Sequence, residues 1–383
     1  MEYTYPDYYK KFVCTGSACR DNCCAAGWQI SIDEESLNMY KNMEGDIGVR
    51  IRNSIDWKTG LFEQYEHKCA LLNENGLCDV YCDAGEDKMC VLCQRYPRHY
   101  EEYENLREIS LSISCPEAAR IVLTRKEKTG FYTEEDETEE EYEDFDYLMF
   151  TKLVEIREFI FKTVQDRSMP FKHRMAIVLK TVHDIQNLIN KDEIFEIDEL
   201  LDKFNQPDFT KSAIKSLKCY EDKAINRKEY LAAMMGRLHK LEVLKYDWTA
   251  FVEKCERILY SGATAEEYLD KCQEFDEYYA EHEYEYEQIL VYFIFTYFCG
   301  AVYDYDAESK LKFGLVSVLL IKELDRAVWI KNGGTLSLED QIEIVHRFSK
   351  EVEHSDLNLD DMEKMMDKDG VFGLRKMLAA IVS

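Results

Sequence analysis

Cysteine is the residue type in this chain whose number and spacing could support chemistry. Ten of the fourteen cysteines lie between Cys14 and Cys115. A metal ion or an iron–sulfur cluster needs several thiolates within a few ångströms, and closely spaced cysteines on turns can supply them. We therefore expect the first part of the chain to build a thiolate-rich metal site, an interpretation favoured over disulfides or coincidence.

The ten cysteines fall into four groups with short internal spacings. These are Cys14, Cys19, Cys23 and Cys24; Cys69, Cys78 and Cys82; Cys90 and Cys93; and Cys115, which precedes Pro116. A Cys-x2-Cys pair is typical of a chelating knuckle, and a Cys-Pro dipeptide is common in cluster ligation. The four later cysteines, Cys219, Cys255, Cys272 and Cys299, are scattered through helical patterns and are expected to pack as small apolar side chains.

The spacing alone leaves the metal open, because soft thiolates suit zinc and iron–sulfur clusters alike. The Cys-x3-Cys-x2-Cys run of radical S-adenosylmethionine enzymes does not occur. Neither do the GxGxxG, GxxxxGK[ST], GxSxG or HExxH motifs. A Rossmann methyltransferase or dehydrogenase and a P-loop NTPase are therefore disfavoured.

The composition predicts the elements that must position these thiols. Hydrophobic residues make up 46% of the 383, and with only 5 Pro and 16 Gly there is little turn punctuation. Such a chain is expected to be globular and mainly α-helical. The fold class predicted is an irregular Cys-rich domain with a few short strands, followed by an all-helical domain.

Three segments follow from the pattern: a Cys-rich metal-binding domain over 1–130, an acidic linker over 131–146, and a helical domain over 147–383. Within the first, we expect a helix over 33–43 capped by Asp33, and short strands over 61–66, 70–72 and 107–114. In the helical part, Asn226, Thr264 and Ser337 each precede an acid three residues later and are predicted N-caps. Helix boundaries are expected at 168–170, 206–207, 261–262 and 333–334.

Charge and the absence of sorting signals predict the surroundings. The formal net charge of −28 disfavours nucleic acid and membrane surfaces as partners and favours a lysine-bearing protein surface. No signal peptide is recognisable after Met1, so a cytoplasmic location with reduced thiols is expected. The apolar stretch 289–302 is too short to span a membrane and predicts a buried helix.

Several motifs together resemble the flagellin lysine-N-methylase family, and the first part also resembles small Cys-rich domains that chelate zinc or iron. The motifs are Phe12-x-Cys14-x4-Cys19-x3-Cys23-Cys24-x3-Trp28, Cys69-Ala-Leu-Leu72, Gly76-Leu-Cys78, Cys90-x2-Cys93-x2-Tyr96-Pro97-Arg98 and Leu111-Ser-Ile-Ser-Cys115-Pro116. Weaker similarity covers 292–297 and 302–313.

The resemblance implies transfer of a methyl group from S-adenosylmethionine to lysines of flagellin, with a [4Fe-4S] cluster involved. It places the metal ligands at Cys14, Cys19, Cys23, Cys24, Cys69, Cys78, Cys90, Cys93 and Cys115. Cys82 has no place in the pattern. Arg98 and Trp28 are candidates for contacting the cofactor. No catalytic base and no oligomeric state are predicted.

Two alternatives remain open at this point. One is a metal-binding or redox-sensing protein without transferase activity, and the other is a flagellin-binding assembly factor with structural zinc.

Overall fold

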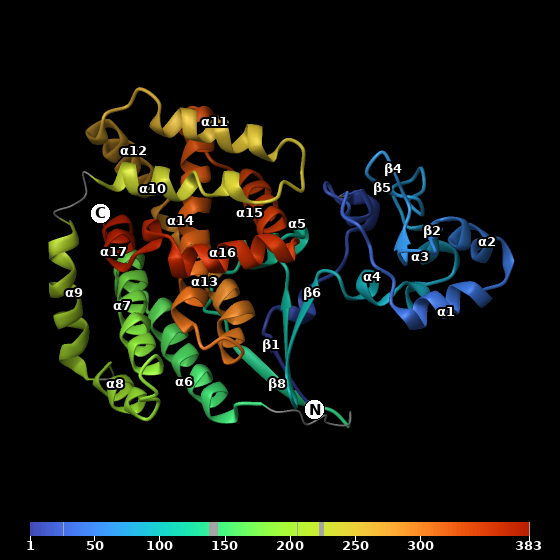
Figure 1. The fold of residues 1–383 in the computed structure, drawn as a ribbon. Helices are drawn as coiled ribbons and strands as arrows, with labels where there is room; N and C mark the ends of the chain where they lie inside the picture. The colour runs from blue at the N-terminus through green and yellow to red at the C-terminus, as the bar shows by residue number, and fades with distance from the viewer. Residues whose placement is uncertain (26, 138–144, 205, 222–225, 383) are drawn as a thin grey trace.

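Apolar residues at three- and four-residue intervals form most of this chain into amphipathic helices. The computed structural model describes residues 1–25, 27–137, 145–204, 206–221 and 226–382 (Figure 1). The helices are α1 Glu34–Asn42, α2 Gly45–Asn53, α3 Asp79–Asp83, α4 Val91–Arg95, α5 Pro116–Leu123, α6 Tyr147–Val164, α7 Phe171–Ile189, α8 Glu196–Phe204, α9 Pro207–Glu221, α10 Arg227–Met235, α11 Trp248–Tyr260, α12 Ala265–Tyr278, α13 Glu283–Tyr297, α14 Ala307–Lys331, α15 Leu338–Glu353, α16 Asp356–Lys368 and α17 Leu374–Val382. The mainly helical fold class is confirmed.

Helix α14 lies at the centre of the helical part. It is 25 residues long, and α7, α11, α13, α15 and α16 pack against it. Apolar residues surround it on most sides, as expected of a helix that is buried all round. This body supplies the rigid frame onto which the N-terminal segments are placed.

Within the described part of the chain, eight strands form one four-stranded sheet and two small hairpins, all before residue 136. The strands are β1 Glu2–Pro6, β2 Ile55–Asp56, β3 Leu61–Phe62, β4 Gln64–Tyr65, β5 Lys68–Cys69, β6 Arg98–Tyr103, β7 Leu106–Leu111 and β8 Phe131–Glu135. The larger sheet has the order β6-β7-β1-β8, in which β1 runs parallel to β7 and antiparallel to β8. Since β7 packs against α13, this sheet is part of the helical body's framework.

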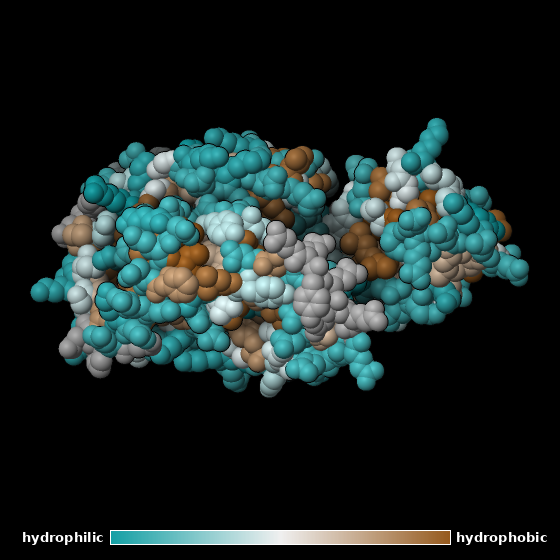
Figure 2. All heavy atoms as spheres, turned by 60° about the horizontal axis from the view of Figure 1, so that its bottom comes forward, coloured by the Kyte–Doolittle hydropathy of each residue, from teal (hydrophilic) through white to brown (hydrophobic). Residues whose placement is uncertain are grey.

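Two separate apolar cores divide the chain. The smaller core contains Ile30, Tyr40, Ile51 and Phe62 together with buried cysteines, all from the segment between the first and the third cysteine groups. The larger core takes in residues on both sides of position 130, from Tyr8 to Val382. Figure 2 shows the corresponding two lobes, with apolar residues gathered where the lobes face each other. The Cys-rich lobe lies beside the helical body.

Local predictions hold where side chains cap helices. Asp33, Thr264 and Ser337 each accept a hydrogen bond from a backbone amide at the start of their helices. Asn226 is the exception: its backbone is already helical, and its side chain makes no cap bond. The four predicted helix boundaries at 168–170, 206–207, 261–262 and 333–334 are confirmed.

Three further predictions concerned a strand over 70–72, the acidic linker over 131–146 and the apolar stretch 289–302. The expected strand over 70–72 is a turn, because the Leu72 amide donates to the Cys69 carbonyl; the strand is Lys68–Cys69 instead. Residues 131–135 of the predicted linker form β8, and 138–144 lie outside the described residues. The stretch 289–302 is buried in α13 and the following 3-10 turn, as expected. None of the described helices is both long and apolar enough to cross a membrane.

Candidate metal centre

Six thiol groups gather in the smaller core. They come from a 3-10 turn, a strand and the first residues of two short helices: Cys23 and Cys24 of η3 (Cys23–Ala25), Cys69 of β5, Cys78 before α3, Cys90 before α4 and Cys93 within it. All of them except Cys23 line one small cavity, and Cys23 contacts Cys24. Members of the second and third sequence groups thus meet the end of the first.

Hydrogen bonds between thiols lower the pKa of Cys23, Cys78 and Cys90 and raise that of their partners Cys24 and Cys93. Cys24 lies between Cys23 and Cys78 and hydrogen-bonds to both, which lowers the pKa of each of those two thiols. Cys93 likewise lowers the pKa of Cys90. A thiol that donates to its neighbour stabilises the neighbour's thiolate, the form that binds metal. Burial, by contrast, raises the pKa of Cys69 to about 11.

Cys14, Cys19 and Cys115 form a second, smaller group that does not line this cavity, although Cys19 neighbours Cys23 of the first group. Burial raises the pKa of Cys115 to about 12, and the neighbouring thiols Cys19 and Cys14 add to this rise. Cys14 is exposed, whereas Cys115 is buried at the start of α5. The nine predicted ligands are therefore divided six and three by the fold. All fourteen cysteines are among the described residues, and each is a free thiol.

The donor chemistry of the six-thiol group fits a soft metal, since thiolates select zinc, copper(I) and iron–sulfur clusters. Within the described residues, no three His, Cys, Asp or Glu side chains already stand in the geometry of a bound ion. The contacts that exist are Cys23–Cys24–Cys78 and Cys90–Cys93.

Asp33 ties the third cysteine group to the rest of the lobe. Its Oδ1 accepts the Ser36 amide at 2.9 Å, which caps α1, and its Oδ2 accepts the Val91 amide at 3.0 Å at the start of α4. Although burial opposes it, these amide bonds hold the pKa of the Asp33 carboxyl below its ordinary value. One carboxylate thus fixes the position of the turn that carries Cys90.

We predict that Asp33→Ala destabilises the lobe by about 1 kcal/mol through the lost cap. It should also lower metal affinity about tenfold, because the support behind a ligand is removed. Metal content after dialysis against a chelator, together with urea unfolding, would measure both effects. Asp46→Ala, an exposed first-turn residue of α2, is the matched control. Equal metal retention by the two variants would contradict the supporting role of Asp33.

An aromatic cluster adjoins the thiols where the lobe meets α15. The Trp28 ring stacks on His354 at 4.6 Å, and Tyr96 contacts the same indole edge-on at 5.3 Å. The Lys350 ammonium lies 4.8 Å from the centre of the indole. His354 also hydrogen-bonds to Ser114, the residue before Cys115, at 2.6 Å. Burial, helped by the charge of Lys350, lowers the pKa of His354 to about 4, so this imidazole is neutral near pH 7.

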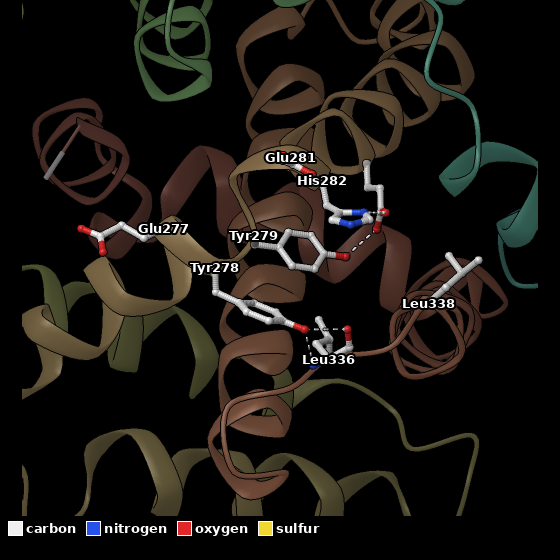
Figure 3. A pocket seen from close by; sticks show the side chains of 8 residues that line it. Glu277, Tyr278, Tyr279, Glu281, His282, Leu336 and Leu338 are labelled. Carbon is white, nitrogen blue, oxygen red and sulfur yellow. Dashed lines mark hydrogen bonds and ion pairs between the residues drawn. The ribbon is translucent and has the colours of Figure 1, made fainter.

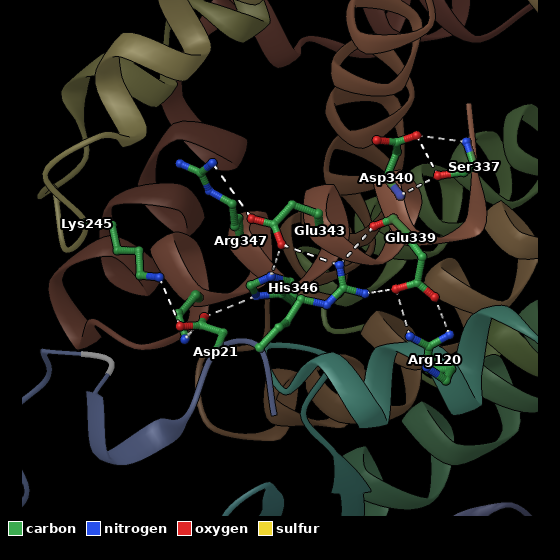
Figure 4. A network of polar contacts seen from close by, with 11 residues as sticks. Asp21, Arg120, Lys245, Ser337, Glu339, Asp340, Glu343, His346 and Arg347 are labelled. Carbon is green, nitrogen blue, oxygen red and sulfur yellow. Dashed lines mark hydrogen bonds and ion pairs between the residues drawn. The ribbon is translucent and has the colours of Figure 1, made fainter. Parts of the chain in front are cut away.

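Asp21, between Cys19 and Cys23, attaches the first cysteine group to the helical body. Its carboxylate pairs with Lys350, with Lys245 at 3.0 Å, and with His346 at 3.5 Å (Figure 4). Burial would raise the pKa of Asp21, but the two ammonium groups outweigh it and hold this pKa below its ordinary value. Beside it, Arg20 and Arg120 both pair with Glu339 at the start of α15. The cysteine loop is therefore held along the length of α15.

The two predicted cofactor contacts lie in different surroundings. Trp28 belongs to the aromatic cluster, where His354 already covers one part of the ring. Arg98, in β6, lies over the rings of Phe12 and Tyr9 at 5.5 and 6.0 Å. Cys82, left out of the predicted set, is exposed on α3.

Sequence reasoning missed Asp21, Lys245, His346, Lys350 and His354. Only Asp21 carried a usable signal, because it lies between two cysteines of one motif. The other four lie in the loop before α11, in α15 and at its C-terminal cap, with no motif of their own, and only packing brings them to the cysteine loop.

Parts of this chain are similar to known lysine N-methylases. The model of the FliB lysine N-methylase C-terminal domain matches residues 157–380. Lysine-N-methylases of Salmonella typhimurium and Salmonella choleraesuis are each 31% identical over 130 residues, 31% of this chain and 32% of theirs. The flagellar biosynthetic protein FliU of Salmonella muenchen is 30% identical over 130 residues, 31% of this chain and 76% of its own.

The match thus spans about a third of the length of the two lysine-N-methylases. No solved structure matches this chain. The family match covers more than half of the sequence, including the helices that hold the Asp21 and Trp28 contacts. This chain belongs to the FliB lysine N-methylase family.

Proposed function

We propose that this protein is an S-adenosylmethionine-dependent protein-lysine N-methyltransferase that acts on flagellin. The match to the lysine N-methylase family over 157–380 carries the proposal. The names of the relatives, lysine-N-methylase and flagellar biosynthetic protein, support the reaction and the substrate respectively. The acidic charge of the chain, −28, suits a lysine-bearing partner.

We further propose that the six-thiol group holds an iron–sulfur cluster, with zinc as the alternative. Four thiolates are enough for one cluster, and Cys23, Cys78 and Cys90 are the thiols whose pKa is lowered. Bound there, a cluster with one iron free of cysteine would supply a position for the amino and carboxylate groups of S-adenosylmethionine. The group of Cys14, Cys19 and Cys115 would then have a separate structural or redox role.

The aromatic cluster suits the chemistry that lysine methylation demands of the protein. The reaction needs the neutral amine, whereas the unperturbed pKa of lysine is about 10.4. A site walled by Trp28 and Tyr96 would desolvate the amine and disfavour its charged form. His354 is neutral there and can form a hydrogen bond with an amine, while Lys350 would repel an ammonium ion. Together these groups would favour the reactive form of the substrate.

The experiment is methyl transfer by the full chain. Protein purified anaerobically and reconstituted with iron and sulfide would be incubated with methyl-labelled S-adenosylmethionine and purified flagellin. Label on flagellin lysines is expected. If the cluster-loaded protein leaves flagellin unlabelled, the methyltransferase proposal is wrong. If the absorption spectrum of the loaded protein does not change when S-adenosylmethionine is added, the proposed position of the cofactor at the cluster is wrong.

One observation favours a second candidate, a redox-sensing metal protein. The contacts of Cys90 with Cys93, and of Cys24 with Cys23 and Cys78, are also those from which an oxidant could make disulfides. Release of metal on mild oxidation, by protein that transfers no methyl group, would support this alternative.

Asp21→Asn tests the attachment of the cysteine loop. The change keeps the shape of the side chain but leaves Lys350, which is 2% exposed, without its counter-charge. We expect a loss of about 1–3 kcal/mol in stability and a fall of about tenfold in methyl transfer as the loop shifts on α15. Urea unfolding and the flagellin assay measure these, with exposed Asp83→Asn as control. Wild-type behaviour of Asp21→Asn in both assays would refute the attachment.

A further inference from the structure

A pocket in the helical body belongs to neither thiol group. It has a volume of about 320 Å³ and lies where α12 passes through the turn Ala280–His282 into α13, facing the loop before α15. This volume is at the lower end of the range, about 300–1000 Å³, that small ligands occupy. Figure 3 shows Tyr278, Tyr279 and His282 side by side in its wall.

The lining of this pocket is acidic and aromatic. Glu281 and Glu285 contribute carboxyl groups, and Tyr278 and Tyr279 contribute two phenol rings, whereas the carboxylate of Glu277 points away from the rings (Figure 3). The described lining residues include no lysine or arginine, and His282 is their one basic side chain. Carboxylates around an aromatic wall form an environment that attracts a cation and disfavours an anion.

Glu285 is the buried carboxyl group of this set. It is 2% exposed; Tyr279 donates to its Oε2 at 2.5 Å, and His282 hydrogen-bonds to its Oε1 at 2.8 Å. Burial raises the pKa of Glu285, because those bonds do not fully replace water. Glu287, two residues further along α13, is just as buried but pairs with Arg167 and Arg174.

The contrast between these two glutamates points to a ligand. Among the ion pairs of the described residues, Glu285 has His282 and no lysine or arginine. A cation entering the pocket would supply the charge that Arg167 and Arg174 supply to Glu287.

Tyr278 forms a rigid rim for such a cation. Its ring is 43% exposed, and its hydroxyl is held by the backbone of Leu336, accepting from the amide at 3.0 Å and donating to the carbonyl at 3.2 Å. A ring fixed at both ends of its side chain loses little entropy on binding. An ammonium group over such a ring gains about 0.5–1 kcal/mol or more as it is desolvated.

We propose that this pocket binds the ammonium group of a lysine side chain presented by a protein partner. Glu285 supplies the buried counter-charge, Tyr278 and Tyr279 pack on the aliphatic stem, and Glu281 draws the cation to the mouth. That the partner is flagellin rests on the proposed function; that the pocket takes an alkylammonium group does not.

The position of the pocket indicates docking, with methylation elsewhere. The pocket contacts Leu338 at the start of α15, whereas the Trp28–His354 stack lies at the other end of that helix. Sixteen residues at 1.5 Å each separate the two ends by about 24 Å. One lysine of a partner would therefore be held in the pocket while another reaches the aromatic cluster.

The test is binding of Nα-acetyl-lysine methylamide to the intact protein, followed by calorimetry and NMR without S-adenosylmethionine or flagellin. The neutral norleucine analogue is the ligand control. We expect the lysine analogue to bind at least tenfold more tightly. Equal binding of the two analogues would overturn the proposal. Because this assay needs no methyl transfer, its failure and the failure of the proposed function are distinguishable.

Variants locate the site of that binding. Glu285→Gln keeps the shape and both hydrogen-bond partners and should weaken the lysine analogue at least tenfold; Glu266→Gln, exposed on α12, should not. Tyr278→Leu removes the partly exposed ring at the rim and leaves Glu285 in place, so it decides the question if Glu285→Gln fails to fold. If Glu285→Gln folds and binds the lysine analogue as tightly as the wild type, the analogue does not bind in this pocket. If Glu285→Gln does not fold, the same result with Tyr278→Leu leads to the same conclusion.

Discussion

Cys78→Ser is expected to lower the affinity for the proposed metal by about 100-fold or more, and the proposed methyl transfer with it. Cys78 contacts Cys24 and lies among Cys69, Cys90 and Cys93, so it belongs to the centre of the six-thiol group. A serine hydroxyl does not ionise near neutral pH and cannot replace a thiolate ligand. Removing a residue that only hydrogen-bonds to a metal ligand lowers metal affinity about 10–100-fold, and removing the ligand itself should lower it by more.

The measurement is iron, zinc and acid-labile sulfide in protein purified anaerobically. Cys82→Ser is the matched control, since Cys82 lies four residues further, on helix α3, and is exposed. It should keep its metal. Cys14→Ser tests the division of the thiols, because Cys14 belongs to the other group. If Cys14→Ser lost as much metal as Cys78→Ser, the six-and-three division would be incorrect.

Arg157→Met is expected to destabilise the fold by about 3–5 kcal/mol, the cost of leaving a buried charge unpaired. Arg157 in α6 donates two hydrogen bonds to the carboxylate of Glu108 in β7, one of them at 2.5 Å. The two residues are 6% and 2% exposed. This pair joins the sheet to the helical body, so its loss should affect the whole unfolding transition.

Urea unfolding followed by circular dichroism measures this effect. The double variant Glu108→Leu/Arg157→Met removes both charges and should recover much of the lost stability, because no unpaired charge then remains. Lys364→Met, on the exposed side of α16, should stay within about 0.5 kcal/mol of the wild type. A double variant no more stable than Arg157→Met would show that packing, rather than the unpaired carboxylate, dominates.

Local sequence signals predicted local structure well. Asp33, Thr264 and Ser337 were predictable caps because a short polar side chain and the amide three residues later interact within one turn. The alternation over 109–113 predicted a strand because successive side chains of a strand point to opposite faces, and β7 covers this stretch as far as Leu111. The prediction of Asn226 as a cap was wrong because its own backbone is helical, and the side-chain types around it do not indicate this.

The candidate site was predictable only in part. Spacing alone could bring Cys90 to Cys93 and Cys23 to Cys24, since each pair is separated by at most two residues. The family resemblance selected nine cysteines, and that ligand set stays a prediction. Spacing gave no means to learn that Cys115 lies with Cys14 and Cys19 rather than with Cys90.

The sequence by itself determined the chemistry that the chain can offer: a concentration of thiols before residue 116, a surplus of carboxylates, and helices throughout the rest. Tertiary structure decided which of these groups meet. Asp21 and Lys350 are 329 positions apart, and their contact exists because α15 packs against α5 and α14 and so faces the cysteine loop. The free energy of such a contact depends on packing across the whole core, which short-range spacing does not encode.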